Sequence, residues 1–88
     1  MLACGGSSTT TEETYTVRGL IVEVQGGSIT DLAFLAVRDE AGNLWEFFAS
    51  GFVGLTPSHL REHQAFGQAV TVTYRETSDG LAVVGLSD

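Results

Sequence analysis

Between residues 15 and 88 the apolar side chains follow a two-residue period that one segment with helical features interrupts. Segments with the alternation and turn-residue boundaries of half-buried strands are 15–24, 32–38, 44–49, 68–76 and 81–86. Segment 57–66 instead begins after Thr56 and Pro57, which suit a helix N-terminus, and ends before Gly67, which suits a helix C-terminus. The sequence therefore predicts a mainly β fold with the element order β-β-β-α-β-β and one short helix.

Alternation within these segments predicts which side chains face the core. Trp45 and Phe47 alternate with a charged residue, so both aromatic rings are expected to point inward. Gly19 lies in the middle of the first expected strand, where glycine usually marks a bulge or a sharp bend. The apolar side of the helix is predicted to lie between Leu60 and Phe66.

The element order resembles the OB-fold, a five-stranded Greek-key barrel whose helix closes one end. The resemblance covers residues 15–86 and implies a small β-barrel that binds its ligand across the second and third strands and the adjoining loops. An open β-meander or an SH3-like barrel is the alternative, although neither requires so well capped a helix.

Aromatic residues are the candidate ligand contacts of such a barrel. Possible stacking platforms are Trp45, Phe47, Phe48 and Tyr74. Alternation places about half of them in the core, and Phe48 and Phe52 are the aromatic residues expected at the surface. Segment 50–55, which contains two glycines, is expected to form a mobile binding loop. Alternatively, Phe52 packs beneath the end of the barrel.

The beginning of the chain carries a separate signal. Leu2-Ala3-Cys4, followed by two glycines, resembles the cleavage site of a bacterial lipoprotein. The resemblance implies that Cys4 carries a thioether-linked lipid, which would anchor the protein to the cell membrane or outer membrane on its extracytoplasmic side. Residues 5–14 contain only Gly, Ser, Thr and Glu, a composition that predicts a flexible spacer. The alternative is a cytosolic protein with a stray terminal thiol.

These observations divide the chain into two parts. Residues 1–14 are interpreted as a lipoprotein signal remnant and tether, and residues 15–88 as one OB-like barrel domain. The only cysteine is Cys4, so an internal disulfide is impossible.

The charge balance argues against one common OB ligand. Eleven acidic residues face four arginines, for a formal net charge of −7. Nucleic-acid-binding surfaces need clustered cations, so no nucleic acid is expected as a partner.

Both histidines of the chain lie in one stretch of the expected helix. His59 and His63 are four residues apart, so they share a helix face, and two imidazoles at this spacing can chelate one transition metal ion. Two ligands underfill the shell of zinc or copper, so binding is expected to be weak, with Glu62 at most a peripheral carboxylate. The alternative is a solvated helix face around a buried Leu60.

The same five residues, 59–63, also resemble the H-x-x-E-H pattern of the inverted zinc proteases. Those enzymes take a third metal ligand from a later helix. The later part of this chain is expected to form strands, and its acidic residues are placed at a strand end, in a turn and after the last strand: Glu76, Asp79 and Asp88. No catalytic residues, and no enzymatic activity, are therefore predicted.

A further resemblance concerns the passage from helix to strand. Segments 56–63 and 67–70 are faintly similar to the corresponding passage in the haem chaperone of cytochrome c maturation, an anchored extracytoplasmic OB-like barrel. The likeness implies an OB-like barrel and a location outside the cytoplasm. The residues with which that family attaches haem match no position of this sequence.

The sequence as a whole predicts a membrane-tethered, non-catalytic module of the cell envelope. Its partner would be the membrane, through the lipid, together with a protein, glycan or small ligand. The alternative is a metal- or haem-handling module that uses His59 and His63. No cofactor is predicted apart from a weakly bound transition metal.

Overall fold

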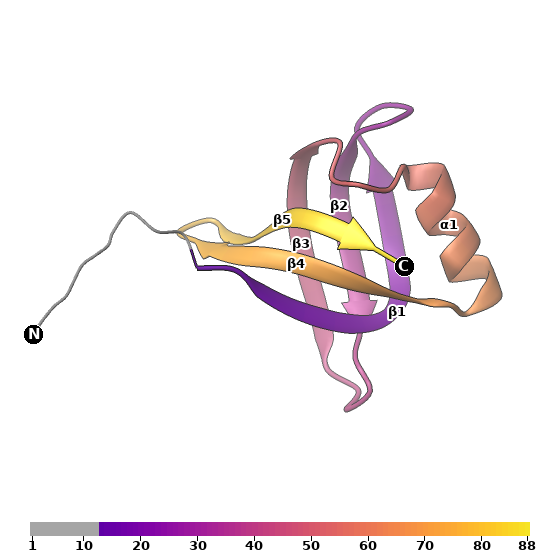
Figure 1. Cartoon of the computed structure of the whole chain (residues 1–88), viewed down its shortest axis with the longest axis horizontal. Helices are drawn as coiled ribbons and strands as arrows, with labels where there is room; N and C mark the ends of the chain where they lie inside the picture. The colour runs from indigo at the N-terminus through magenta and orange to yellow at the C-terminus, as the bar shows by residue number, and fades with distance from the viewer. Residues whose placement is uncertain (1–12) are drawn as a thin grey trace, which may run out of the picture.

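Five strands close into a barrel with the order β1-β2-β3-β5-β4 in the computed structural model, which describes residues 13–88. The elements are β1 (Tyr15–Gly26), β2 (Leu32–Arg38), β3 (Leu44–Gly51), α1 (Pro57–Phe66), β4 (Ala69–Thr77) and β5 (Gly80–Ser87). Figure 1 shows α1 beside the barrel, between the end of β3 and the start of β4. The predicted fold class, a mainly β OB-like barrel with one short helix, is confirmed.

The barrel closes because β1 pairs with two strands. Its first half pairs with β4, from Tyr15 to Leu20, and its second half pairs with β2, from Leu20 to Gly26. Gly19 stands where the strand changes partner, and a Cβ there would lie 2.5 Å from the backbone oxygen of Arg38. Glycine is therefore required at this position by the close approach of the neighbouring backbone.

The bulge itself lies farther along β1. The pairing with β2 shifts between Ile21 and Glu23, so Val22 is the extra residue and turns outward. At this bulge the Val22 carbonyl accepts a 2.8 Å hydrogen bond from Nε2 of Gln64 on α1. The bulge thereby fastens the helix to the side of the barrel.

The remaining seam of the barrel is narrow. β3 and β5 run parallel and are paired only at Phe48 and Ala82, whereas all other neighbouring strands are antiparallel. The link between β3 and α1 supports this seam, because the amide of Leu86 donates a 2.7 Å hydrogen bond to the carbonyl of Val53.

One continuous apolar core fills the barrel. Its buried members are Ile21, Leu32, Leu35, Val37, Phe47, Val53, Leu60, Val70, Val72, Tyr74, Val83 and Leu86. Phe47 is fully enclosed, as predicted. Trp45 also points inward but is only half-buried, because it covers the edge of the core and stacks on Phe47 with ring centroids 6.4 Å apart.

Helix α1 has the predicted ends. The hydroxyl of Thr56 accepts a hydrogen bond from the amide of His59, Pro57 occupies the first turn, and Gly67 adopts a left-handed conformation with φ of 66°. Such caps satisfy backbone groups that a helix leaves unpaired at its ends.

The buried side of α1 differs from the prediction at one position. Phe66 was expected on the apolar side, but 75% of it is exposed. Its expected place is taken by His63, since the buried residues of the helix are Pro57, Leu60 and His63. These lie three residues apart and form one stripe against the barrel, and Phe66 at the last helical position projects beyond the barrel.

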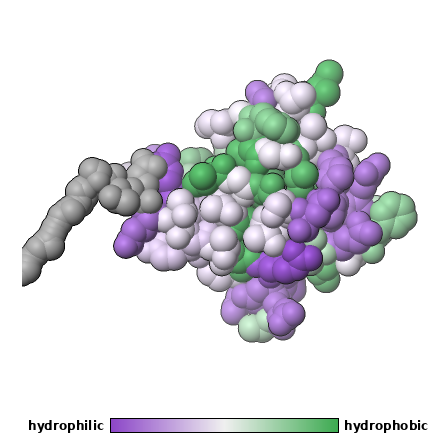
Figure 2. Space-filling view, viewed as in Figure 1, coloured by the Kyte–Doolittle hydropathy of each residue, from purple (hydrophilic) through white to green (hydrophobic). Residues whose placement is uncertain are grey.

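Figure 2 shows that the face around α1 is mostly hydrophilic, like the β2–β3 hairpin below it. Within residues 13–88, no helix has the length and apolar content needed to cross a bilayer. The predicted lipidation at Cys4 and most of the predicted tether fall in residues 1–12, outside the part of the chain that the structure describes.

Candidate metal centre

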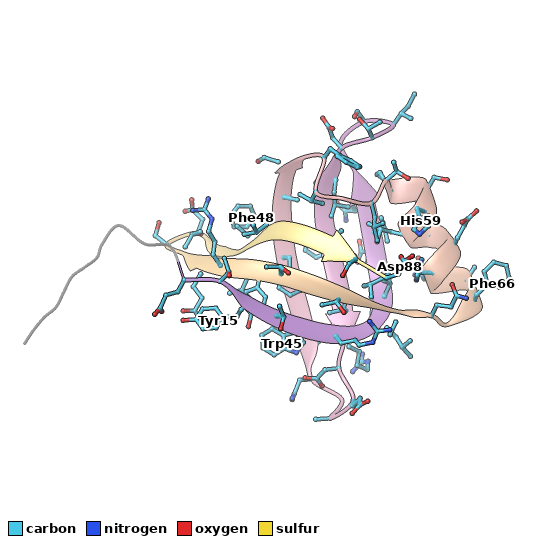
Figure 3. The ribbon with its side chains drawn as sticks, in the orientation of Figure 1. Tyr15, Trp45, Phe48, His59, Phe66 and Asp88 are labelled. Atoms are coloured by element: carbon cyan, nitrogen blue, oxygen red, sulfur yellow. The ribbon has the colours of Figure 1, made fainter. Side chains whose placement is uncertain are left out.

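Three potential metal ligands meet where α1 approaches the end of β5. Nε2 of His63 lies 3.1 Å from Nε2 of His59 and 3.0 Å from Oδ1 of Asp88, and Nε2 of His59 lies 3.3 Å from the same oxygen. Figure 3 shows His59 on α1 and Asp88 just beyond β5, with their side chains turned toward one another. The two histidines expected from the sequence are thus joined by a carboxylate that was not expected there.

Local structure explains how these side chains come together. His59 and His63 are one turn apart on α1, which brings their rings to a centroid distance of 4.9 Å. The β4–β5 hairpin pairs Thr71 with Ser87, so Asp88 comes to lie beside the start of β4. Because β4 begins three residues after α1 ends, the hairpin register delivers Asp88 to the helix.

The spacing of the three atoms suits a tetrahedral metal ion. Zinc bonds of about 2.0–2.1 Å to histidine nitrogen or carboxylate oxygen place two ligands of a tetrahedral shell about 3.3 Å apart. The observed separations are 3.1, 3.3 and 3.0 Å. The separations therefore match the edges of a tetrahedral shell to within a few tenths of an ångström.

Hydrogen bonds alone do not satisfy the cluster. A neutral imidazole carries one N–H and one acceptor nitrogen. The other ring nitrogen of His63, Nδ1, is buried and has no hydrogen-bond partner among the described residues. If Nε2 of His63 carries the proton, Nδ1 is an unpaired acceptor, and if Nδ1 carries it, Nδ1 is an unpaired donor. Every tautomer leaves a buried polar atom unpaired, at a typical cost of about 1–3 kcal/mol.

The unpaired Nδ1 of His63 also limits the affinity of the centre for metal. Metal-bound histidines usually donate their second N–H to a carboxylate or carbonyl, which fixes the ring and raises its basicity. His63 has no such acceptor within residues 13–88. A metal ion would convert the three mutual contacts into bonds, but without this support we expect modest affinity.

The cluster opens into a surface cavity. The cavity has a volume of about 700 Å³, and besides the three ligands it is lined by Arg18, Glu62, Phe66, Gln68 and Ala69. The side chains of His59 and Asp88 are 41% and 66% exposed, so solvent reaches the ligand atoms from this side. Glu62 lines the cavity but does not belong to the metal-ligand cluster.

The aromatic candidates lie elsewhere. Phe48 and Phe52 are both at the surface, with exposed fractions of 37% and 59%. The loop that follows β3 is held to β5, because the carbonyl of Val53 accepts a hydrogen bond from the amide of Leu86. Three of the four candidate platforms pack together instead, since Trp45, Phe47 and Tyr74 have ring centroids 5.2–6.4 Å apart.

A second polar cluster closes the β2–β3 hairpin. The carboxylate of Asp39 accepts hydrogen bonds from Nε1 of Trp45 at 2.9 Å and from the backbone amides of Asn43 and Ala41 at 2.9 and 3.0 Å. The Trp45 bond, followed by that from the Asn43 amide, holds the pKa of Asp39 below its ordinary value of 3.8. The acceptor oxygens of this cluster are thus paired with donors of the hairpin itself.

Sequence reasoning missed Asp88 as a ligand. It placed that residue after the last strand and set it aside together with the other late acidic residues. The signal that could have found it is the turn at residues 78–80, whose hairpin pairs the end of the last strand with the residues that follow the helix.

Comparisons of this chain with protein-family models, with curated proteins and with solved structures found no match.

Proposed function

We propose that this protein is a non-catalytic binding module whose ligand is a transition metal ion, held by Nε2 of His59, Nε2 of His63 and Oδ1 of Asp88. One observation carries the proposal: the three ligand atoms lie 3.0–3.3 Å from one another, near the edge lengths of a tetrahedral shell. The alternative of a solvated helix face does not account for His63, of which only 8% is exposed.

The ligand set favours zinc or copper over magnesium or calcium. Imidazole nitrogen suits zinc and copper, whereas magnesium and calcium prefer shells made of oxygen alone. Here two of the three ligand atoms are nitrogens. In this proposal the module binds, carries or senses the ion.

We place this module outside the bacterial cytoplasmic membrane, tethered through lipid on Cys4. The support is the lipoprotein-like sequence Leu2-Ala3-Cys4 and the polar composition of residues 5–14. Nucleic acid is not a partner in this proposal. Arg18 and Arg38 line a common cavity, but Asp39 and Glu40 line it as well, so the cations gathered there are balanced.

Calorimetric titration with zinc at neutral pH tests the metal site. We expect one ion per chain, and His59→Ala, His63→Ala and Asp88→Ala should each weaken binding by at least tenfold. Glu62→Gln is the matched control, because it alters a cavity carboxylate outside the ligand cluster, and its affinity should stay within about twofold. Equal affinity of all five proteins, or no heat of binding, would refute the proposal.

The pH dependence provides an independent check. Only neutral imidazole binds metal, and free imidazole takes up a proton below about pH 6.5. Zinc affinity should therefore fall steeply as the pH is lowered from 7.5 to 5.5. Affinity that stays constant over this range would show that the histidines are not ligands.

Detergent partitioning tests the anchor. Expressed in a bacterium from its gene with the native upstream sequence, the protein should enter the detergent phase, and Cys4→Ser should release it into the aqueous phase. Equal partitioning of both forms would contradict the lipoprotein proposal and leave the metal site unaffected.

A further inference from the structure

We propose that the metal ion in this centre binds a small organic carboxylate, which Arg18 and Phe66 hold in the adjoining cavity. This inference rests on the proposed metal site and names the ligand that the loaded site would take. It follows from the open coordination position, the charge around it and the exposed aromatic ring at the end of the helix.

The protein supplies three ligands within its described part, and zinc in a tetrahedral site takes four. The position left over belongs to water or to an external ligand, as in zinc sites that act on small molecules. Because His63 is buried against the barrel while His59 and Asp88 are partly exposed, that position faces the cavity and not the core.

The charge in the cavity favours an anion of low charge. A divalent ion and the Asp88 carboxylate together carry one positive charge, and the Arg18 guanidinium adds another. Glu62 lines the same cavity and subtracts one. The loaded cavity is thus net positive by about one unit in a chain of net charge −7, which matches a monoanion better than a phosphate dianion.

Arg18 is positioned for this role. Arg18 lines the cavity, and one of its terminal nitrogens donates a 2.9 Å hydrogen bond to Oγ1 of Thr71 on β4. A guanidinium has five N–H donors in a planar fork, so a single bond to the protein leaves donors with the geometry that a carboxylate requires. Metal and arginine would then share the two oxygens of one carboxylate.

Phe66 supplies the apolar part of the site. It lines the cavity, it is 75% exposed, and Figure 3 shows it projecting from the end of α1 away from the barrel. The core does not need this ring, since the buried stripe of the helix consists of Pro57, Leu60 and His63. An aromatic ring beside a metal-bound carboxylate would contact an apolar or aromatic substituent of the ligand. The preferred ligand is therefore an aromatic or aliphatic monocarboxylate.

Visible absorption of the cobalt-loaded protein tests the proposal, because Co²⁺ replaces Zn²⁺ and its spectrum responds to a change of ligand. Cobalt is titrated first, then benzoate, acetate or inorganic phosphate at constant ionic strength. We expect a saturable spectral change with benzoate, about tenfold weaker binding of acetate and little response to phosphate.

The variants separate the contributions. Arg18→Gln should weaken benzoate binding about tenfold, as expected for loss of a charge-assisted hydrogen bond, while cobalt affinity stays within about twofold. Arg61→Gln is the matched control, because it removes the same charge from an exposed residue of α1 that does not line the cavity. Phe66→Ala should reduce the preference for benzoate over acetate to about twofold.

The outcomes distinguish this inference from the metal site itself. Absence of cobalt binding would refute both proposals. Cobalt binding without a response to benzoate would overturn the carboxylate proposal alone, and so would a stronger response to phosphate. Equal loss of benzoate binding in Arg18→Gln and Arg61→Gln would overturn the role of Arg18.

Discussion

Two carboxylates at different places in this barrel have opposite surroundings. Asp39 in the β2–β3 hairpin accepts hydrogen bonds from one indole and two backbone amides, all at 2.9–3.0 Å. Asp88 beyond β5 faces two imidazole nitrogens, at 3.0 and 3.3 Å, and one of those rings has a buried nitrogen that finds no partner within residues 13–88.

The Asp39 cluster stabilises the folded hairpin, whereas the cluster around Asp88 has the arrangement of a ligand-binding site. At Asp39 donors of the chain match the acceptors, so the cluster stabilises the hairpin and lowers the pKa of its carboxyl group. At Asp88 two imidazole nitrogens and one carboxylate oxygen lie within 3.3 Å of one another, an arrangement that a cation can bridge.

The largest expected effect on stability comes from removing the indole of Trp45, which is bonded to Asp39. Trp45→Ala should lower the free energy of unfolding by about 3 kcal/mol, at the low end of large aromatic truncations because the ring is only half-buried. Urea unfolding monitored by circular dichroism measures this loss. The neighbouring Leu44→Ala, at a position that is 50% exposed, should cost less than about 1 kcal/mol, and an equal cost at both positions would contradict the placement of Trp45.

Substitution of His63 in the cluster around Asp88 should increase the stability of the protein. Without metal, His63→Leu should raise the free energy of unfolding by about 1 kcal/mol. The substitution puts an apolar side chain in place of a buried ring whose Nδ1 has no partner in the described part of the chain. His59→Leu, at a partly exposed position, should stay within about 0.5 kcal/mol of the wild type. Destabilisation by His63→Leu in chelator-treated protein would show that the cluster is satisfied as it stands.

The smallest effect concerns the pH dependence of the hairpin. The pKa of Asp39 is lowered in the folded state, so its ionised form stabilises the protein at pH values above the ordinary 3.8. This contribution is lost as the pH falls through the lowered pKa. Asp39→Asn should therefore lower the melting temperature at pH 7, and the difference from the wild type should shrink as the pH falls below 3.8. Glu40→Gln, at the adjacent exposed position, is the control. An equal change of melting temperature in this variant would show that Asp39 has no stabilising role of its own.

How far the sequence predicts this molecule depends on the range of the interactions involved. The strands and the helix between Thr56 and Gly67 follow from alternation and capping, which are local signals. The exposure of Phe66 and the burial of His63 depend on how the helix rotates against the barrel. Three-residue spacing from Pro57 and Leu60 accounts for the burial of His63, whereas Phe66 continues the same series and is exposed because it stands at the last position of the helix.

The candidate site was half predictable. The spacing of His59 and His63 places two ligands on one helix face, and the structure keeps them together. Asp88 joins them through the register of a hairpin formed by later residues, a contact across 29 positions of sequence from His59. Such a contact becomes visible only when strand pairing and helix placement are considered together.

The most direct test of the account observes the ring nitrogens of both histidines by long-range proton–nitrogen NMR during zinc addition. We predict that Nε2 of His59 and Nε2 of His63 shift to the range of metal-bound nitrogen at one equivalent of zinc, while Nδ1 of each ring carries the proton. Asp88→Ala should need a large excess of zinc for the same change. Ring-nitrogen signals that remain unchanged at one equivalent of zinc and at neutral pH would contradict the claim that this cluster is a metal site.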